Sequence, residues 1–412
     1  MGPEHEHLSE ADRLVLDGLR SAGEAWIVGG WVREAASGRR ETDMDIATTL
    51  LPAKVKELFP RSLMVGEKYG TVIVRLDEGV SDGTWEVTTL RSEGSYGDGR
   101  RPDMVEFGQN IEDDLARRDF TINAMAIDSD GSVIDPFGGV SDLREGVLRA
   151  VGIASERLGE DGLRIMRAYR FLDSAEGIRD MEPSLRFAVR ENLGMLEVVS
   201  RERVGMEMER ILGGRNAGAV ISQMHEDGVL SHVLTEITCT ASPSFCTDSL
   251  VNLALLCNED QSEGSELADK LRSALMMAKE PLRQVAFLHD ARNASVSTEI
   301  SGLRRFRAAL PEEWQSAFVV YSRGLGRDVV EFAEALASLS PLRVGNAPLI
   351  DGNTLAAATG LDPGPRMGRL KGRLHRIQIE RDLSSEDEVL SVLDELDWRG
   401  SDYEEWSALS WP

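Results

Sequence analysis

The sequence of 412 residues has no long apolar runs and contains only three cysteines. No apolar run reaches the roughly 18 residues that a membrane-spanning helix needs, and residues 1–20 lack the apolar core of a signal peptide. We therefore expect a cytoplasmic protein. Cys239, Cys246 and Cys257 have no second pair nearby that would complete a zinc site. We expect them to be small buried side chains, and we expect no structural metal.

Lysine is also scarce, and the formal net charge is -25. By itself this charge argues against a nucleic-acid partner, because neutralising phosphates requires Lys and Arg. Nearly all of the 46 basic residues are Arg, however, which is the better donor for planar, bidentate phosphate contacts. Several of them form local groups along the chain: Arg100 with Arg101, Arg117 with Arg118, and Arg164 with Arg167 and Arg170. We expect a basic cleft on an otherwise acidic protein.

The chain is too long for one compact core, so we expect two to four domains. Short stretches typical of strands occur early, at residues 24–30, 43–49, 70–76 and 84–90, with a helix expected at 53–59. Beyond residue 141, apolar residues recur at helical spacing without convincing strands, at 160–173, 184–192, 201–213, 216–228 and 249–340, and then near 366–380 and 385–397. The predicted fold class is α+β, with a head on a small mixed sheet (1–140) followed by an all-helical neck (141–215), body (216–340) and tail (341–412).

Two glycines end the first predicted strand. Gly29 and Gly30 would let the backbone approach a phosphate, and the helix that follows would supply N–H donors. Arg33 could reach the same anion. Taken alone, such a pair is more typical of an ordinary turn at a strand end.

Two carboxylates follow in the second predicted strand. Asp43 and Asp45 occupy positions i and i+2 and so project from one face of a strand. Carboxylates side by side repel each other unless a cation lies between them, and one or two Mg²⁺ ions suit this arrangement. Glu86, in the strand at 84–90, could supply a third carboxylate or could equally point outward.

Two further motifs combine arginine with other polar side chains. Arg117 and Arg118 are followed by Asp119 and Asn123, which together offer phosphate donors and hydrogen-bonding groups for a ribose; the alternative is a surface network of ion pairs. In the second motif, a charged residue recurs every third position, at Asp161, Arg164, Arg167 and Arg170. On a helix these would follow one face, where Asp161 and Arg164 could present an acceptor and donors to a base edge. The alternative is a solvated charged face.

Together these motifs resemble the class II tRNA nucleotidyltransferase and bacterial poly(A) polymerase family. GGWVRE and DMD are similar to its metal and phosphate motif, RRDFTINAMA to its ribose motif, and GEDGLRIMRAYRF to its nucleotide-selecting neck helix. The segment RER followed by EMERIL resembles the next neck motif. The resemblance covers residues 24–215 well and reappears faintly at 350–368.

The resemblance implies a template-independent enzyme that adds nucleotides to RNA 3′ ends. It implies that Asp43 and Asp45 bind Mg²⁺, and that Asp161 and Arg164 select CTP and then ATP. It also implies contacts with the incoming nucleotide from Gly30, Arg33, Arg118, Asp161, Arg164, Arg167 and Arg170. The tail is expected to bind RNA.

Residues 91–107 resemble the full-length flexible loop of the enzymes that add adenosine. The residues that carry this likeness include Arg91, Tyr96, Arg100 and Arg101. We therefore expect addition of CCA to tRNA 3′ ends from CTP and ATP. An A-adding tRNA nucleotidyltransferase or a poly(A) polymerase remains the alternative.

The chain departs from the family pattern at Glu34, where Asp is frequent, and at Gly162, where Pro or another residue is common. Neither departure removes an expected ligand. His289 and Asp290 form an HD pair like that of metal-dependent phosphohydrolases, but without a second such pair we expect an ordinary surface pair.

Two rival functions remain. The first is an RNA-binding protein without catalysis, which the intact Asp43 and Asp45 pair disfavours. The second is a transferase acting on a protein or small molecule, whose relatives usually lack the ribose and neck motifs.

Overall fold

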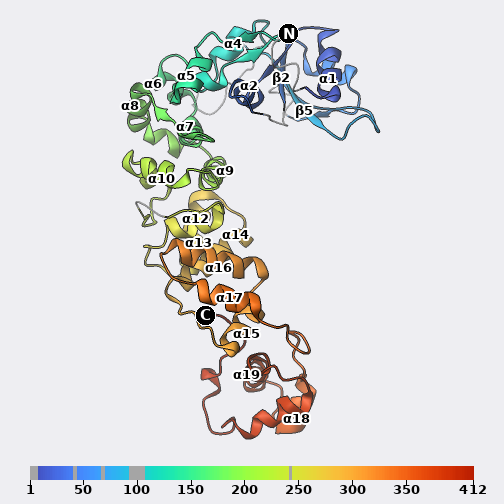
Figure 1. Ribbon diagram of the computed structural model, residues 1–412, viewed down its shortest axis with the longest axis vertical. Coiled ribbons are helices and arrows are strands. Elements are labelled where there is room, and N and C mark those ends of the chain that lie inside the picture. The colour runs from blue at the N-terminus through green and yellow to red at the C-terminus, as the bar shows by residue number, and fades with distance from the viewer. Residues whose placement is uncertain (1–7, 40–43, 66–69, 92–106, 241–243) are drawn as a thin grey trace. The chain divides into compact units, whose positions relative to one another are not determined.

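Figure 1 shows the computed structural model of the chain. It describes residues 8–39, 44–65, 70–91, 107–240 and 244–412, so Asp43 and residues 92–106 lie outside the described residues. The chain divides into two compact units: the first comprises residues 1–235 and 273–276, and the second comprises 236–272 and 277–412. Within the described ranges, no helix is long and apolar enough to cross a membrane.

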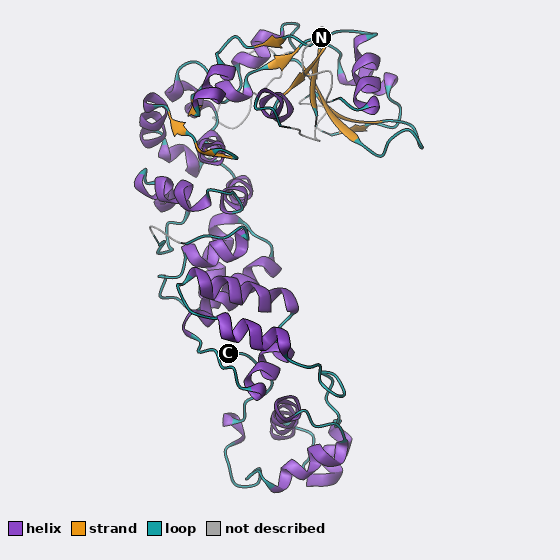
Figure 2. Ribbon diagram, viewed as in Figure 1, coloured by secondary structure: helices purple, strands orange, loops and turns teal. Residues whose placement is uncertain are grey.

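A mixed sheet lies in the first unit (Figure 2). Its described strands have the order β3-β4-β5-β2-β1-β6-β7. Their bounds are Ala25–Val28 (β1), Asp45–Thr48 (β2), Leu63–Met64 (β3), Thr71–Arg75 (β4), Thr84–Thr89 (β5), Ala126–Ile127 (β6) and Val133–Ile134 (β7). β2 and β5 are parallel, whereas the other neighbouring strands are antiparallel. The mixed sheet and the four early strands expected from the sequence are confirmed.

The two faces of this sheet pack against different helices. Ile27 and Ile46 belong to a core shared with α1 (Glu10–Arg20) and α3 (Pro52–Leu58). Val28 and Ala47 belong to a second core, shared with α4 (Ile111–Ala116). Side chains alternate between faces along a strand. Asp45 therefore shares the α4 face with Ala47.

Further helices complete the first unit. Their bounds are Gly30–Ala36 (α2), Gly139–Glu145 (α5), Ala154–Glu160 (α6), Leu163–Leu172 (α7), Pro183–Glu191 (α8), Arg201–Leu212 (α9), Ala217–Glu226 (α10) and Val229–Val233 (α11), with a 3₁₀ turn at Thr121–Asn123. Of these, α6, α9 and α10 pack against α7. The expected helices at 53–59, 184–192, 201–213 and 216–228 are confirmed within two residues at each end.

The expected single helix over 160–173 is wrong. α6 ends at Glu160, Asp161 is extended with φ −148° and ψ 107°, and α7 begins at Leu163. The break is packed closely against another part of the chain, because a Cβ on Gly162 would lie 2.3 Å from the backbone oxygen of Met195. Asp161 therefore does not belong to the helical series formed by the arginines of α7.

The expectation of no strands after residue 141 is also wrong. Short strands occur at Val147–Leu148 (β8), Asp173–Ser174 (β9), Gly177–Ile178 (β10) and Asp180–Met181 (β11). β8 pairs with β11 and β9 with β10. Strands of two residues are too short to show an alternating pattern in the sequence.

The second unit is helical in its described residues. Its helices are Ser249–Leu256 (α12), Gly264–Leu275 (α13, whose end belongs to the first unit), Lys279–Asp290 (α14), Ile300–Ala309 (α15), Glu312–Gly324 (α16), Val330–Ser338 (α17), Gly352–Thr359 (α18), Pro365–Arg381 (α19) and Glu386–Ser391 (α20). The helix α18 was not expected from the sequence. Trp411 packs against the rings of Phe306 and Phe318, with centroids 4.8 and 4.5 Å away.

Two sequence expectations for small groups need correction. Of the three cysteines only Cys257 is buried, whereas Cys239 and Cys246 are partly exposed. His289 is not at the surface: it is fully buried on α14, with Nε2 3.0 Å from the backbone oxygen of Ser262. The described residues contain no group of three or more side chains suited to hold a metal.

Candidate active site

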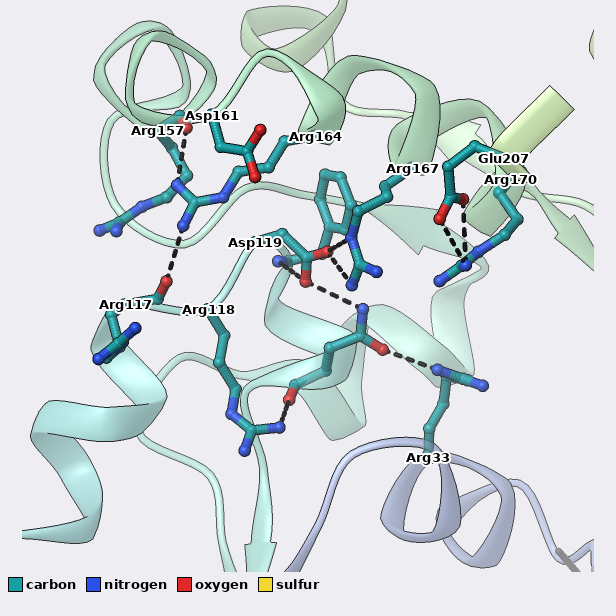
Figure 3. A network of polar contacts seen from close by, with 12 residues as sticks. Arg33, Arg117, Arg118, Asp119, Arg157, Asp161, Arg164, Arg167, Arg170 and Glu207 are labelled. Atoms are coloured by element: carbon teal, nitrogen blue, oxygen red, sulfur yellow. Dashed lines mark hydrogen bonds and ion pairs between the residues drawn. The ribbon is translucent and has the colours of Figure 1, made fainter. Parts of the chain in front are cut away.

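A cavity of about 510 Å³ in the first unit brings the sequence motifs together. Its walls come from the turn between β1 and α2, from the segment after α4, and from α7 and α9 (Figure 3). The described residues that line it include seven arginines and three aspartates: Arg33, Arg117, Arg118, Arg164, Arg167, Arg170, Arg203, Asp45, Asp119 and Asp161. The cavity thus carries an excess of positive charge in a protein of net charge -25. The expected basic cleft is present.

Gly29 and Asp45 meet at one end of this cavity. Asp45 begins β2 opposite Val28, the last residue of β1. Gly29 follows with φ +76°, a conformation that side chains disfavour. A Cβ at Gly29 would lie 2.7 Å from Oδ2 of Asp45. The glycine is therefore required both by the turn and by the close approach of the carboxylate.

Asp45 and Glu86 lie next to each other on neighbouring strands. They are register partners in the parallel pair of β2 and β5. Both line a second cavity, of about 270 Å³, together with Arg91, Arg117 and Arg118. Glu86 thus faces the site instead of pointing away from it. Neighbouring strands lie roughly 4.8 Å apart, and two carboxylates that project from one face of such a pair fit a hard cation such as Mg²⁺.

Arg33 is held by partners on two sides. Its NH1 donates to Oδ1 of Asn123 over 2.7 Å, and its Nε donates to Glu34 over 3.1 Å. Glu34 also accepts from Arg39 over 2.7 Å. Burial alone raises the pKa of Glu34, but Arg39 and Arg33 outweigh burial and lower it. The longer side chain at position 34 therefore bridges two arginines and keeps its charge.

Asn123 connects Arg33 to the next motif. Its amide nitrogen donates to Oδ1 of Asp119 over 3.1 Å, and its backbone oxygen accepts from NH1 of Arg118 over 3.1 Å. Arg118 also donates to Asp114 on α4 over 3.3 Å. Asn123 and Asp119 are nearly buried, and most of their hydrogen-bonding capacity serves to position the arginines.

Asp119 pairs with Arg167 on α7. Nε of Arg167 lies 2.6 Å from Oδ2 of the aspartate. Burial alone raises the pKa of Asp119, but the guanidinium of Arg167 and the amide of Asn123 hold that pKa below its ordinary value. The same carboxylate raises the pKa of Arg167 despite its burial. Both groups are therefore ionised at neutral pH.

Arg170, one turn further along α7, pairs with Glu207 on α9 over 3.0 Å. Burial and the neighbouring charge of Arg167 lower the pKa of Arg170 to about 10. It remains a cation at neutral pH. Glu207 is almost completely buried and also accepts from Arg210 over 3.2 Å.

Arg164 and Asp161 are each held by groups from other segments. NH1 of Arg164 donates to the backbone oxygen of Arg157 over 2.7 Å, and NH2 donates to that of Arg117 over 3.0 Å. Asp161 accepts from NH2 of Arg203 on α9 over 2.8 Å and from the backbone of Leu163 over 3.0 Å. Both side chains line the cavity despite the break between α6 and α7.

The expected flexible loop is described only at its ends. Arg91 forms an isolated bridge with Phe107. Tyr96, Arg100 and Arg101 lie outside the described residues, as does Asp43. Sequence reasoning assigned no site role to Phe171 or Arg203, although both line the cavity. Phe171 directly follows the arginine series, and Arg203 lies in the RER motif, so proximity to those motifs was the available signal.

Comparison with known proteins places these features in a family. Residues 25–149 match the model of the poly(A) polymerase head domain, and residues 180–240 match one described as a probable RNA- and SrmB-binding site of polymerase A. The CCA-adding enzyme of Lactiplantibacillus plantarum is 32% identical over 400 residues, which cover 92% of this chain and 94% of that protein. The chain belongs to the CCA-adding enzyme family.

Further relatives agree with this membership. The CCA-adding enzyme of Geobacillus stearothermophilus is 42% identical over 220 residues, or 53% of each chain. The crystal structure of the Bacillus stearothermophilus CCA-adding enzyme in complex with CTP superimposes with a TM-score of 0.73 and 27% identity, over 96% of this chain and 98% of that one. The family resemblance drawn from the sequence motifs and the α+β fold are confirmed.

Proposed function

We propose that this protein adds C, C and A to the 3′ end of tRNA from CTP and ATP, without a nucleic-acid template. The observation that carries the proposal is that one cavity is lined both by Asp45 of the sheet and by Asp161 and Arg164 of the neck. One end would carry out the transfer and the other would select the base. We also propose a cytoplasmic location for it.

Three carboxylates supply the metal site in this proposal. Asp43 and Asp45 would hold Mg²⁺, and Glu86 would assist from the neighbouring strand. Bound there, Mg²⁺ would lower the pKa of the RNA 3′-hydroxyl and stabilise negative charge on the leaving pyrophosphate. In the reaction the 3′-hydroxyl gives up its proton to water and its oxygen bonds to the α-phosphorus. The bond from that phosphorus to the oxygen that bridges to the β-phosphate breaks, and pyrophosphate leaves with the bridging oxygen.

The arginines would bind the triphosphate. Arg33, Arg118, Arg167 and Arg170 line the cavity, and each is fixed by a hydrogen bond or ion pair to a neighbouring residue. Positioned cations of this kind stabilise charge that develops during transfer, because they need no reorganisation at that moment. Gly29 leaves room beside Asp45, because a Cβ there would lie 2.7 Å from the carboxylate, and Gly30 leaves room beside Arg33, whose NH2 would lie 3.7 Å from a Cβ. Asp119 and Asn123 would orient the ribose and the arginines.

Asp161 and Arg164 would select the base. Each is restrained by partners from another segment, so the donors of Arg164 and the acceptors of Asp161 keep fixed positions. Arginine can donate to acceptors of cytosine and adenine, and the carboxylate can accept from their exocyclic amines. These side chains would thus select each base, which a template strand does in templated synthesis.

RNA binding is proposed for the tail. The sequence of α19, PRMGRLKGRLHRIQIER, contains six arginines and lysines but one glutamate. Such a helix is exceptional in a protein with 71 acidic residues. Basic side chains on it would contact the RNA backbone, because phosphate contacts need cations.

Addition of A alone, or synthesis of poly(A), is the competing activity. The relative of similar fold was crystallised in complex with CTP, which supports use of CTP here too. The test is incubation with a tRNA that lacks its terminal CCA, Mg²⁺ and labelled CTP or ATP. Incorporation of C from CTP, followed by one A, is expected. Incorporation of labelled A without C, or of a long tail of A, would replace the proposal with the competing activity. If no label were incorporated, the proposal would be overturned.

A further inference from the structure

Phe171, near the end of α7, lies among three guanidinium groups. The Cζ atoms of Arg170, Arg33 and Arg167 lie 4.3, 5.1 and 5.3 Å from the centre of its ring. Two of these arginines are on the same helix as the ring, and the third comes from α2. The ring lines the cavity and is only partly buried.

The three guanidinium groups around the ring repel each other, and each also pairs with a carboxylate: Arg33 with Glu34, Arg167 with Asp119, and Arg170 with Glu207. These partners bind the edge of each guanidinium, where its N–H donors lie. The ring instead attracts each cation through its negative π face, without using N–H donors. A carboxylate in the same place would occupy the donors that a phosphate needs.

The ring itself is held in place. Phe120 packs edge-on against it, with centroids 5.8 Å apart and an interplanar angle of 71°. The backbone oxygen of Phe171 accepts from NH1 of Arg179 over 2.7 Å, and Arg179 also donates to the backbone of Asp173 over 3.1 Å. Both ring and backbone are therefore anchored to groups outside the arginine cluster.

We propose that Phe171 is a positioning residue that holds Arg33, Arg167 and Arg170 together, with their N–H donors directed to a triphosphate. The proposal rests on the function above, in which these arginines bind the phosphates of the nucleotide. In this proposal the ring supports binding of the phosphates through the arginines and does not stack on the base.

Binding of inorganic tripolyphosphate and of cytidine, each measured by calorimetry without RNA, tests the assignment. Phe171→Leu removes the π face and keeps an apolar side chain. Phe171→Met has the same effect and is used if the leucine variant does not fold. Either variant should weaken tripolyphosphate binding about tenfold and leave cytidine binding within about twofold. Phe171→Tyr keeps the ring and should bind tripolyphosphate like the wild type. In transfer assays the non-aromatic variant should raise the KM for CTP far more than it lowers kcat.

Leu172→Val, a buried neighbour that does not line the cavity, serves as the packing control. Unchanged tripolyphosphate binding in both non-aromatic variants would overturn the assignment. So would weaker cytidine binding with normal tripolyphosphate binding, which would mean that the ring stacks on the base. An equal loss in Leu172→Val would show a packing effect and overturn it as well. A wild-type protein that binds neither CTP nor tripolyphosphate would instead refute the proposed function.

Discussion

Asp119 and Arg167 form an ion pair across the candidate active site. The two residues are 48 positions apart in the sequence, yet Nε of Arg167 lies 2.6 Å from Oδ2 of Asp119. Asp119 is 6% exposed, whereas the side chain of Arg167 is 31% exposed. Because Asp119 precedes the 3₁₀ turn at Thr121–Asn123 and Arg167 lies on α7, the pair joins the segment after α4 to α7.

Asp119→Asn should destabilise the protein by about 2 kcal/mol at pH 7, because Arg167 then lacks its counter-charge but keeps access to water. The pKa of Asp119 is below its ordinary value in the folded protein. Its contribution is therefore complete above about pH 4, the pKa of an unfolded aspartate, and is lost as the pH falls through the lower, folded pKa. Melting temperatures of wild type and variant should differ at pH 7 and converge as the pH falls below about 4. Asp113→Asn, at an exposed position of α4, is the control. A constant difference at every pH would contradict this role.

Gly29→Ala and Gly38→Ala should separate backbone strain from catalytic geometry. Both glycines have positive φ, +76° and +71°. A Cβ at Gly29 would displace the Asp45 carboxylate, whereas a Cβ at Gly38 would meet no atom within 4 Å. Gly38→Ala should cost about 1 kcal/mol of stability from the backbone, and Gly29→Ala should cost more, about 3 kcal/mol, because φ +76° with ψ −140° is a conformation that essentially only glycine adopts. Only Gly29→Ala should also lower kcat, by about 100-fold, since small displacements in a site have such effects. Similar kcat losses in both variants would show that strain alone is responsible.

Glu86→Gln should raise the Mg²⁺ concentration needed for half-maximal transfer by about tenfold. The carboxylate lies beside Asp45 on the neighbouring strand, and an amide oxygen is a weaker ligand without charge. Titration of transfer activity with Mg²⁺ measures this effect. Glu78→Gln, at a residue whose side chain is 91% exposed, should leave the requirement unchanged. Asp43→Ala and Asp45→Ala should each reduce transfer by more than about tenfold, or 1.4 kcal/mol of barrier, at any Mg²⁺ concentration.

Arg203→Ala should impair base selection through Asp161. Arg203 donates to this carboxylate over 2.8 Å from α9, so its loss would leave the carboxylate with the hydrogen bond from the backbone of Leu163 but without its restraint from α9. The ratio of kcat/KM for CTP to that for UTP measures the selection. A double-mutant cycle should show strong non-additivity, with Arg203→Ala adding little once Asp161→Ala is present. Additive losses would mean that Arg203 acts on another part of the substrate.

The sequence predicted those parts of the fold and site that depend on local patterns. The strand around Ile27 is a short apolar run that ends in two glycines, the strands around Ile73 and Val87 alternate, and the mixed sheet appears where expected. Short motifs with conspicuous residue types also led to Asp45, Asp161 and Arg164, which the fold brings into one cavity. Fixed spacing within a motif and its order along the chain are visible without a structure.

Features that depend on contacts between distant segments were not predicted. The break before α7 depends on Gly162 lying against the backbone of Met195, 33 positions away. The roles of Phe171 and Arg203 depend on partners from α2 and from the extended residue Asp161. The periodicity of a sequence does not indicate such packing. A Phe that follows a series of arginines is typical of a residue in the hydrophobic core.

Sequencing of reaction products tests the central claim most directly. Three tRNA substrates, ending before the CCA, after its first C and after its second C, are each incubated with equimolar amounts of all four nucleoside triphosphates and Mg²⁺. If the cavity containing Asp161 and Arg164 selects each base in turn, every product ends in CCA and extension then stops. Products that end in other nucleotides, or that extend into runs of A, would contradict the account.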